Sequence, residues 1–167
     1  MIANELAHDL HSITRDAQID VNRLGGGARI TELSHIELFD RLVTDSDVAS
    51  ASRGLFVDGY YALSVEEACK CIANKVKDLS GKHDKDGQDL MFFVFNEENP
   101  VIRLNSMITT SEKDEQRGYK FLFGGLMSGI RNPRVHEYKF IDDAEVALDL
   151  IQFVDHLMAR LRRGTKV

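Results

Sequence analysis

Three residues with the chemistry of a phosphodiester-cleaving site lie within one short stretch: Arg131, Asn132 and His136. Arginine is a permanent cation whose planar fork suits phosphate, and histidine has an ordinary pKa that suits proton transfer near neutral pH. The asparagine amide carries both a donor and an acceptor. We therefore take these three as candidate catalytic residues, and the neighbouring cations Arg134 and Lys139 as candidate substrate-binding residues.

The spacing alone leaves a structural alternative open, because a motif needs its context. In that alternative Arg131 caps a carbonyl group, Asn132 caps a helix and His136 lies on the surface. Pro133 has no amide donor and fits the first turn of a helix, with Asn132 as its cap. The sequence thus predicts a bend at the motif, with Arg131 ending one helix and His136 on the next turn.

Apolar residues at intervals of three and four predict that the surrounding elements are helices. Ser34 and Glu37 have the spacing of a capping box at the start of one of them. The apolar run Leu90–Phe95 fits a strand or a buried helix, and its helical neighbours favour a short helix. The fold class is therefore predicted to be all-α. The longer predicted helices span residues 3–20, 34–43, 52–79, 111–131 and 143–162.

A run of three glycines, Gly25–Gly27, separates the first predicted helix from the rest of the chain. A length of 167 residues fits one domain with an appendage. We assign residues 1–50 to an N-terminal helical extension and residues 51–164 to a helical bundle.

Composition narrows the class of protein. The net charge of −6 disfavours a general nucleic-acid coat protein, which would be basic. No apolar run approaches the roughly 20 residues of a membrane helix, and the first residues do not resemble a signal peptide, so we expect a cytoplasmic protein without a membrane partner. Cys69 and Cys71 point in different directions on a helix, so we expect reduced, structural cysteines, no metal site and no cofactor.

The predicted helix 111–131 contains four glycines, each of which costs up to about 1 kcal/mol relative to alanine. Such a number suggests that something packs closely against the helix. Gly125 and Gly129 are one turn apart, so their bare faces align. Either a segment of the same chain or a second copy of the chain would fill that space.

Several motifs together resemble the Ymh-type family, which is grouped within the HEPN (higher eukaryote and prokaryote nucleotide-binding) superfamily. The resemblance covers roughly residues 53–162, and the Arg-Asn-x-x-x-His arrangement is the superfamily's signature. The motifs are Phe56–Leu63 with Glu67-Ala68, Asp86-Gly87 with Leu90-Met91, Gln116–Gly118, Leu122–Gly125 and Gly129–His136.

The resemblance implies a HEPN-like helical bundle that forms a homodimer, with two copies of the motif in a cleft across the interface. Many members are metal-independent endoribonucleases, often toxins or phage-defence effectors, and others are non-catalytic interaction or nucleotide-binding modules. In an active member His136 would be the general acid or base, Arg131 would bind the RNA phosphate, and Asn132 would orient the histidine or the phosphate. An antitoxin or a defence-system protein would be the partner.

Tyr138 lies two residues beyond His136 and extends the motif to Arg-x4-His-x-Tyr. The longer pattern resembles HEPN toxins that are silenced when a nucleotidyltransferase antitoxin transfers AMP to the tyrosine. A bulky anionic group beside Arg131 would occupy a phosphate pocket and repel RNA. In the alternative, Tyr138 only packs on the final helix, with its hydroxyl group hydrogen-bonded at the edge of the cleft.

Overall fold

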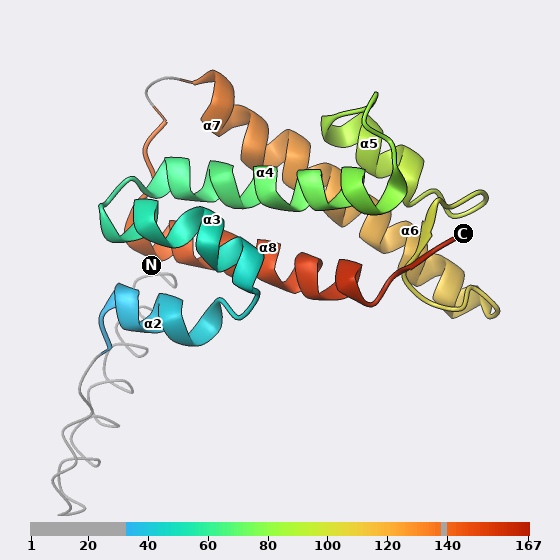
Figure 1. Ribbon diagram of the computed structural model, residues 1–167, viewed down its shortest axis with the longest axis horizontal. Coiled ribbons are helices and arrows are strands. Elements are labelled where there is room, and N and C mark those ends of the chain that lie inside the picture. The colour runs from blue at the N-terminus through green and yellow to red at the C-terminus, as the bar shows by residue number, and fades with distance from the viewer. Residues whose placement is uncertain (1–32, 138–139) are drawn as a thin grey trace, which may run out of the picture. The chain divides into compact units, whose positions relative to one another are not determined.

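The computed structural model describes residues 33–137 and 140–167 of the chain. Most of these residues form helices with one apolar face (Figure 1). This confirms the predicted all-α fold class. The predicted helix 3–20 lies outside the described residues. The elements are α2 (His35–Leu42), α3 (Ser46–Val57), α4 (Tyr61–Ser80), α5 (Gly87–Val94), β1 (Ile102–Arg103), α6 (Thr110–Gly125), the π-helix η1 (Leu126–Arg131), α7 (Asn132–His136), α8 (Ala144–Arg162) and β2 (Thr165–Lys166).

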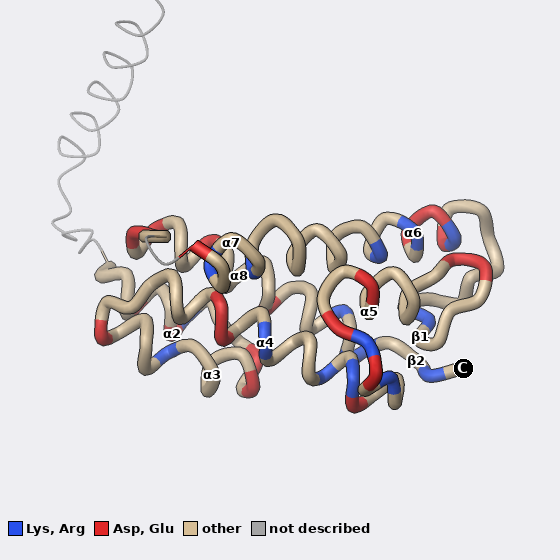
Figure 2. Tube along the Cα trace, turned by 90° about the horizontal axis from the view of Figure 1, so that it is seen from above, with Lys and Arg blue, Asp and Glu red and all other residues tan. Residues whose placement is uncertain are grey.

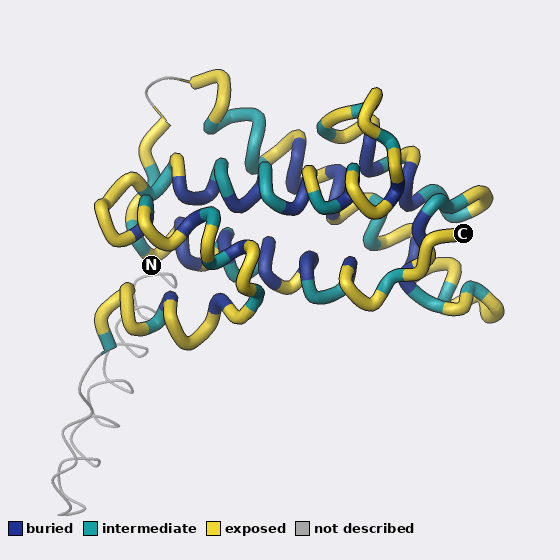
Figure 3. Tube along the Cα trace, in the orientation of Figure 1, coloured by how far each residue is buried: buried dark blue, intermediate teal, exposed yellow. Residues whose placement is uncertain are grey.

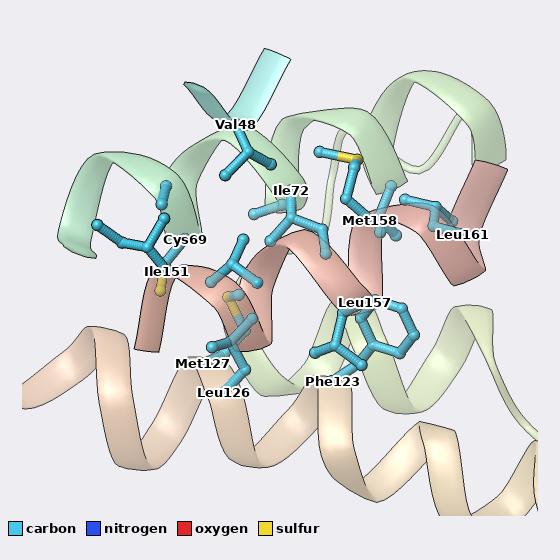
Figure 4. Close-up of a cluster of buried hydrophobic side chains, with 14 of the residues drawn as sticks. Val48, Cys69, Ile72, Phe123, Leu126, Met127, Ile151, Leu157, Met158 and Leu161 are labelled. Carbon is cyan, nitrogen blue, oxygen red and sulfur yellow. The ribbon is translucent and has the colours of Figure 1, made fainter. Parts of the chain in front are cut away.

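The core lies where α3, α4 and α8 face one another and the α6–η1 stretch (Figure 4). Ile72 of α4, Met127 of η1 and Ile151 of α8 are fully buried there. Burying one such side chain contributes about 1.5–3 kcal/mol, so this contact holds the helices in register. The buried positions follow the inner faces of α4 and α8, while the outer faces are exposed (Figure 3).

The residues that the sequence assigned to the end of the N-terminal extension pack within the bundle. Residues 33–167 form one compact unit, and Phe39 of α2 is part of its core. The buried carboxylate of Asp155 on α8 accepts hydrogen bonds from the Thr44 amide at 2.9 Å and the Asp45 amide at 2.7 Å. These bonds fix the loop between α2 and α3 on α8, so residues 33–50 belong with the bundle.

One long helix was predicted over residues 52–79, and this is wrong: α3 and α4 are separate helices. Gly59 has a φ of +81°, in the left-handed region that glycine tolerates. Its amide donates to the Phe56 carbonyl and the Tyr60 amide donates to the Leu55 carbonyl, the pair of bonds that ends a helix in a Schellman motif. The chain therefore turns back, and Phe56 and Tyr61 meet edge to face at 5.2 Å.

The apolar run around Leu90 forms the predicted short helix, α5, which packs on α4 and α6. The following connection is anchored by Gln116, which is fully buried in α6. Its side chain accepts a hydrogen bond from the Leu104 amide and donates one to the Ile102 carbonyl. The short strand β1 is thereby held in place, and it pairs antiparallel with β2 at the C-terminus.

The predicted bend at Pro133 is absent. The helical path runs from α6 through η1 into α7, and Asn132 has helical dihedrals (φ −59°, ψ −42°) rather than those of a cap. The wide turn of η1 lets the Asn132 amide donate five residues back, to the Met127 carbonyl. Pro133 then stands in the first turn of α7, where its missing donor is tolerated. π-Helical turns such as η1 are often found at functional sites.

Glycines of α6 give a first test of the packing. A β-carbon at Gly124 would lie 2.3 Å from Phe92 Cε1, whereas one at Gly118 would meet nothing within 4 Å. We expect Gly124→Ala to lower the free energy of unfolding by about 1–3 kcal/mol, because the Phe92 ring must move. Gly118→Ala should raise it by up to about 1 kcal/mol. Equal values for the two variants in urea denaturation would contradict this packing.

Candidate active site

The three candidate catalytic residues lie at the junction of η1 and α7. Arg131 is the last residue of η1, while Asn132 and His136 are the first and last residues of α7. Both elements contact α4, which fixes their direction. The structure therefore brings the three together within two turns of one helical path, at the end of the bundle where α7 leads into the linker to α8 (Figure 1).

Arg131 is only weakly paired within the chain. Its guanidinium Nη1 lies 3.9 Å from Asp86 Oδ2, which is beyond hydrogen-bond distance. Its Nε atom is buried and has no hydrogen-bond partner among the described residues. A buried donor without a partner costs about 1–3 kcal/mol, so the site would gain from an incoming acceptor. A phosphate oxygen is an acceptor whose geometry suits this planar fork.

Asp86 precedes α5 and was not among the candidate residues. Lys77 Nζ of α4 lies 3.0 Å from its carboxylate, which also faces Arg131. Hydrogen bonding from Lys77 holds the pKa of Asp86 below its ordinary value, and the charge of Arg131 acts in the same direction. Asp86 appeared in the sequence analysis only as part of the Asp86-Gly87 motif of the family resemblance. It lies 45 residues before Arg131, so no local sequence pattern indicated that the two side chains would meet.

Arg134 has a different environment from the one expected of a substrate-binding residue. Its side chain is 5% exposed and forms a bidentate salt bridge with Asp142. Nε donates to Asp142 Oδ2 at 2.6 Å, and Nη2 donates to Oδ1 at 2.8 Å. Its Nη1 donates to the Ile130 carbonyl at 2.7 Å, and its guanidinium stacks on Phe140. Arg134, rather than Arg131, thus caps a backbone carbonyl, and it ties α7 to the segment before α8.

Replacing Arg134 by methionine is expected to lower the free energy of unfolding by about 3–5 kcal/mol, because it leaves the Asp142 carboxylate buried without its partner. Arg117→Met is the matched control, since that side chain is 61% exposed and its Nε lies 3.7 Å from Glu97 Oε1. The control should change stability by less than about 1 kcal/mol. Similar denaturation midpoints for the two variants would contradict the positioning role of Arg134.

Asn132 is half-buried and His136 is exposed. Residues four apart lie on the same face of a helix, so the two side chains share one face of α7. Arg131 precedes His136 by five residues, which places it about 140° away around the helix axis. The structure therefore brings Asn132 and His136 together on one face and directs Arg131 to the flank beside α5. Tyr138 and Lys139 lie outside the described residues.

The cysteines do not join the site. Burial raises the pKa of the Cys69 thiol to about 12, while the charges of Arg134 and Arg131 act in the opposite direction. The thiol therefore lies beneath the motif as a neutral apolar group. Cys71 is half-buried and its pKa is also raised by burial. Both are free, as predicted.

Two structural features of the described residues bear on other classes of protein. No group of three or more histidine, cysteine, aspartate and glutamate side chains in residues 33–137 and 140–167 is arranged to hold a metal ion. None of the helices described there is both long and apolar enough to cross a bilayer.

Residues 43–161 match a family model described as "Protein of unknown function (Hypoth_ymh)". The match covers more than half of the chain, from the end of α2 to the last turn of α8, and includes the whole η1–α7 junction. Searches of curated proteins and of solved structures found no match.

Proposed function

We propose, from the premise that this chain belongs to the Hypoth_ymh family, that it is a metal-independent endoribonuclease of the HEPN type, active as a homodimer. One observation supports this above the others: a half-buried arginine whose Nε has no partner among the described residues is followed directly by an asparagine and, five residues on, by an exposed histidine. This set supplies a phosphate anchor, a proton-transfer group and an orienting amide.

In the proposed reaction His136 removes the proton from a ribose 2′-hydroxyl group, whose oxygen then attacks the adjacent phosphorus. The bond from phosphorus to the 5′-oxygen breaks, and a second histidine protonates that oxygen as it leaves. Arg131 binds the phosphate oxygens, whose negative charge increases during the attack. The products are a 2′,3′-cyclic phosphate and a 5′-hydroxyl end, and the proton balance needs no other reactant.

The need for a second histidine argues for a dimer. One chain carries a single motif, and its helix directs Arg131 and His136 about 140° apart. A second copy facing the first would provide the other histidine and would place each arginine opposite the partner's motif. The proposed reaction therefore uses both copies.

A helix face without side chains, formed by two glycines beside the motif, suits such a dimer contact. Gly125 and Gly129 are exposed, and a β-carbon on either would meet nothing within 4 Å, so packing inside the described chain does not account for them. Phe121 and Leu122 on the same helix are about half exposed. Residues 121–130, which run from the last turns of α6 through η1 to the residue before Arg131, carry no charged side chain, as the tan run of the trace shows (Figure 2). We propose that these residues form the dimer interface.

The biological setting follows from the same resemblance. A toxin or a phage-defence effector would cleave RNA only when released or activated, so an antitoxin or a defence-system protein is the proposed partner. AMP transfer to Tyr138 would be one way to silence the site, and Lys139 would add a cation beside it. Both roles remain predictions.

A non-catalytic HEPN-like module, which binds a nucleotide or a partner protein, is the second candidate function. The net charge of −6 favours it, because an acidic chain attracts RNA weakly outside a small basic site. In that case Arg131 would bind a phosphate group of the ligand, and no phosphodiester bond would be cleaved.

The two candidates differ in one assay. Full-length protein is incubated with a mixed RNA pool in EDTA, and the length distribution of the RNA is followed over time. The ribonuclease shortens the RNA, and the His136→Ala variant does not. Retained RNA length with the wild-type protein at micromolar concentration would favour the non-catalytic module.

A further inference from the structure

The contact between α4, the start of α5 and η1 contains a charge arrangement that the proposed mechanism does not yet use. Lys77 Nζ lies 3.0 Å from Asp86 Oδ1, and Arg131 Nη1 lies 3.9 Å from Asp86 Oδ2. One carboxylate thus stands between two cations. The Lys77 and Arg131 side chains are 22% and 20% exposed, whereas that of Asp86 is 57% exposed.

The exposures indicate which of the three groups can move. The two cations are held against the bundle by α4 and η1, while the carboxylate reaches them from the solvent side. Asp86 makes no side-chain capping bond to α5, so displacement of its carboxylate would not uncap that helix. Its contact with Arg131 exceeds hydrogen-bond distance, and the buried Arg131 Nε has no partner. The pair of cations is therefore only partly satisfied by Asp86.

We infer that Lys77 is a second phosphate-binding residue of the site and that Asp86 occupies, in the free protein, the position that a substrate phosphate takes. The inference rests on the proposed function for the identity of the phosphate, which is a backbone phosphodiester of single-stranded RNA. A phosphodiester and a carboxylate both carry one negative charge. The exchange therefore leaves the local charge unchanged, and the phosphate oxygens form an acceptor set that suits the planar guanidinium of Arg131.

The same arrangement makes Asp86 a competitor of the substrate. Binding of a phosphate must first separate Asp86 from Lys77, which lowers the apparent affinity. Removing the negative charge at position 86 should therefore strengthen phosphate binding, even though it removes an ion pair from the free protein. A purely structural ion pair predicts the opposite or no effect on binding.

The chain offers a matched control on the same helix. Lys75 of α4 lies two residues before Lys77 and pairs with Asp47 at 3.2 Å. The two lysines are similarly exposed, at 30% and 22%. The Lys75–Asp47 pair is bound to Arg162 of α8 and not to the motif. Lys75→Gln and Asp47→Asn thus remove comparable charges away from the proposed site.

The test measures binding of a fluorescent single-stranded 2′-O-methyl RNA, which keeps the phosphates but lacks the 2′-hydroxyl group needed for cleavage. Lys77→Gln should raise its Kd by about tenfold, the effect of losing a contact of about 1.4 kcal/mol. The slope of log K against log salt should become less steep by about 0.7 for the lost charge. Asp86→Asn should lower the Kd several-fold, and both control variants should stay within about twofold of the wild type.

A second measurement does not depend on RNA. Asp86→Asn leaves two neighbouring cations without their carboxylate, so inorganic phosphate should raise its Tm more than that of the wild type or of Asp47→Asn. If Lys77→Gln and Asp86→Asn match their controls in both measurements, the inference is wrong, even where the wild type cleaves RNA. If both measurements behave as expected and no RNA is cleaved, the phosphate site stands and the ribonuclease assignment fails.

Discussion

The His136→Ala variant is expected to cleave RNA at least about 100-fold more slowly than the wild type, because a positioned general acid or base contributes about 10²–10⁴-fold. The fold should not change, since His136 is exposed at the end of α7. His156→Ala is the matched control. That histidine is also exposed on a helix, but it pairs with the Tyr119 hydroxyl group at 3.1 Å on the α6–α8 surface. The control should retain the wild-type rate.

Arg131→Ala should have a loss of similar size, about 10²–10³-fold, because it removes the group proposed to bind the developing charge. Its loss should extend to the binding of uncleavable RNA, whereas His136→Ala should bind such RNA as the wild type does. Arg117→Ala removes an exposed arginine of α6 and serves as the control. If either motif variant cleaves at the wild-type rate, the catalytic assignment is wrong; if both variants are unfolded by circular dichroism, the structural alternative gains.

Gly125→Arg is expected to convert the proposed dimer to a monomer and to abolish cleavage in the same variant. The monomer should tolerate the side chain, because the space outside Gly125 is open. In the dimer the two new guanidinium groups would lie in an uncharged face and would be desolvated without partners. The added charge is positive, so a loss of activity would not come from repulsion of RNA.

Sedimentation velocity at micromolar concentration measures this effect, with Gly54→Arg as the control. Gly54 lies on α3 and also faces open space. The control should remain dimeric and active. A wild-type protein that sediments as a monomer, or a Gly125→Arg dimer with normal cleavage, would contradict the proposed interface.

The sequence predicted those helices whose apolar periodicity and caps are local. The capping box of Ser34 and Glu37 is present at the start of α2, and α8 begins within one residue of the prediction. The division between α3 and α4 was missed because their apolar residues continue with helical spacing across the turn. Gly59 was the available signal, since its left-handed conformation ends α3.

The motif illustrates what local patterns leave out. The types and order of Arg131, Asn132 and His136 were visible in the sequence. Because proline lacks an amide donor, the sequence predicted a bend before α7. In the structure a π-helical turn accommodates Pro133 without a bend, and no local sequence pattern predicts such a turn. The residues that complete the environment, Asp86 and Asp142, come from other segments. Their contacts with the two arginines depend on the packing of α4, α5 and the linker before α8.

The glycines show the same division between composition and packing. Their number in the predicted helix 111–131 indicated a close approach, but no local pattern distinguished the glycines that pack internally from those that do not. In the structure Gly124 packs against Phe92 of the same chain, whereas Gly125 and Gly129 face open space. Internal packing therefore explains one of the four glycines. Gly118 also faces open space, and Gly125 and Gly129 are the two beside the motif that are left for the proposed partner copy.

The most direct test of the account is the chemical identity of the RNA ends. A mixed RNA pool is incubated with the full-length protein in EDTA, and the fragments are analysed by mass spectrometry beside a His136→Ala reaction. We expect 2′,3′-cyclic phosphate and 5′-hydroxyl ends that depend on His136 and form without divalent metal. Intact RNA, or 5′-phosphate ends that appear only when a divalent metal is added, would contradict it.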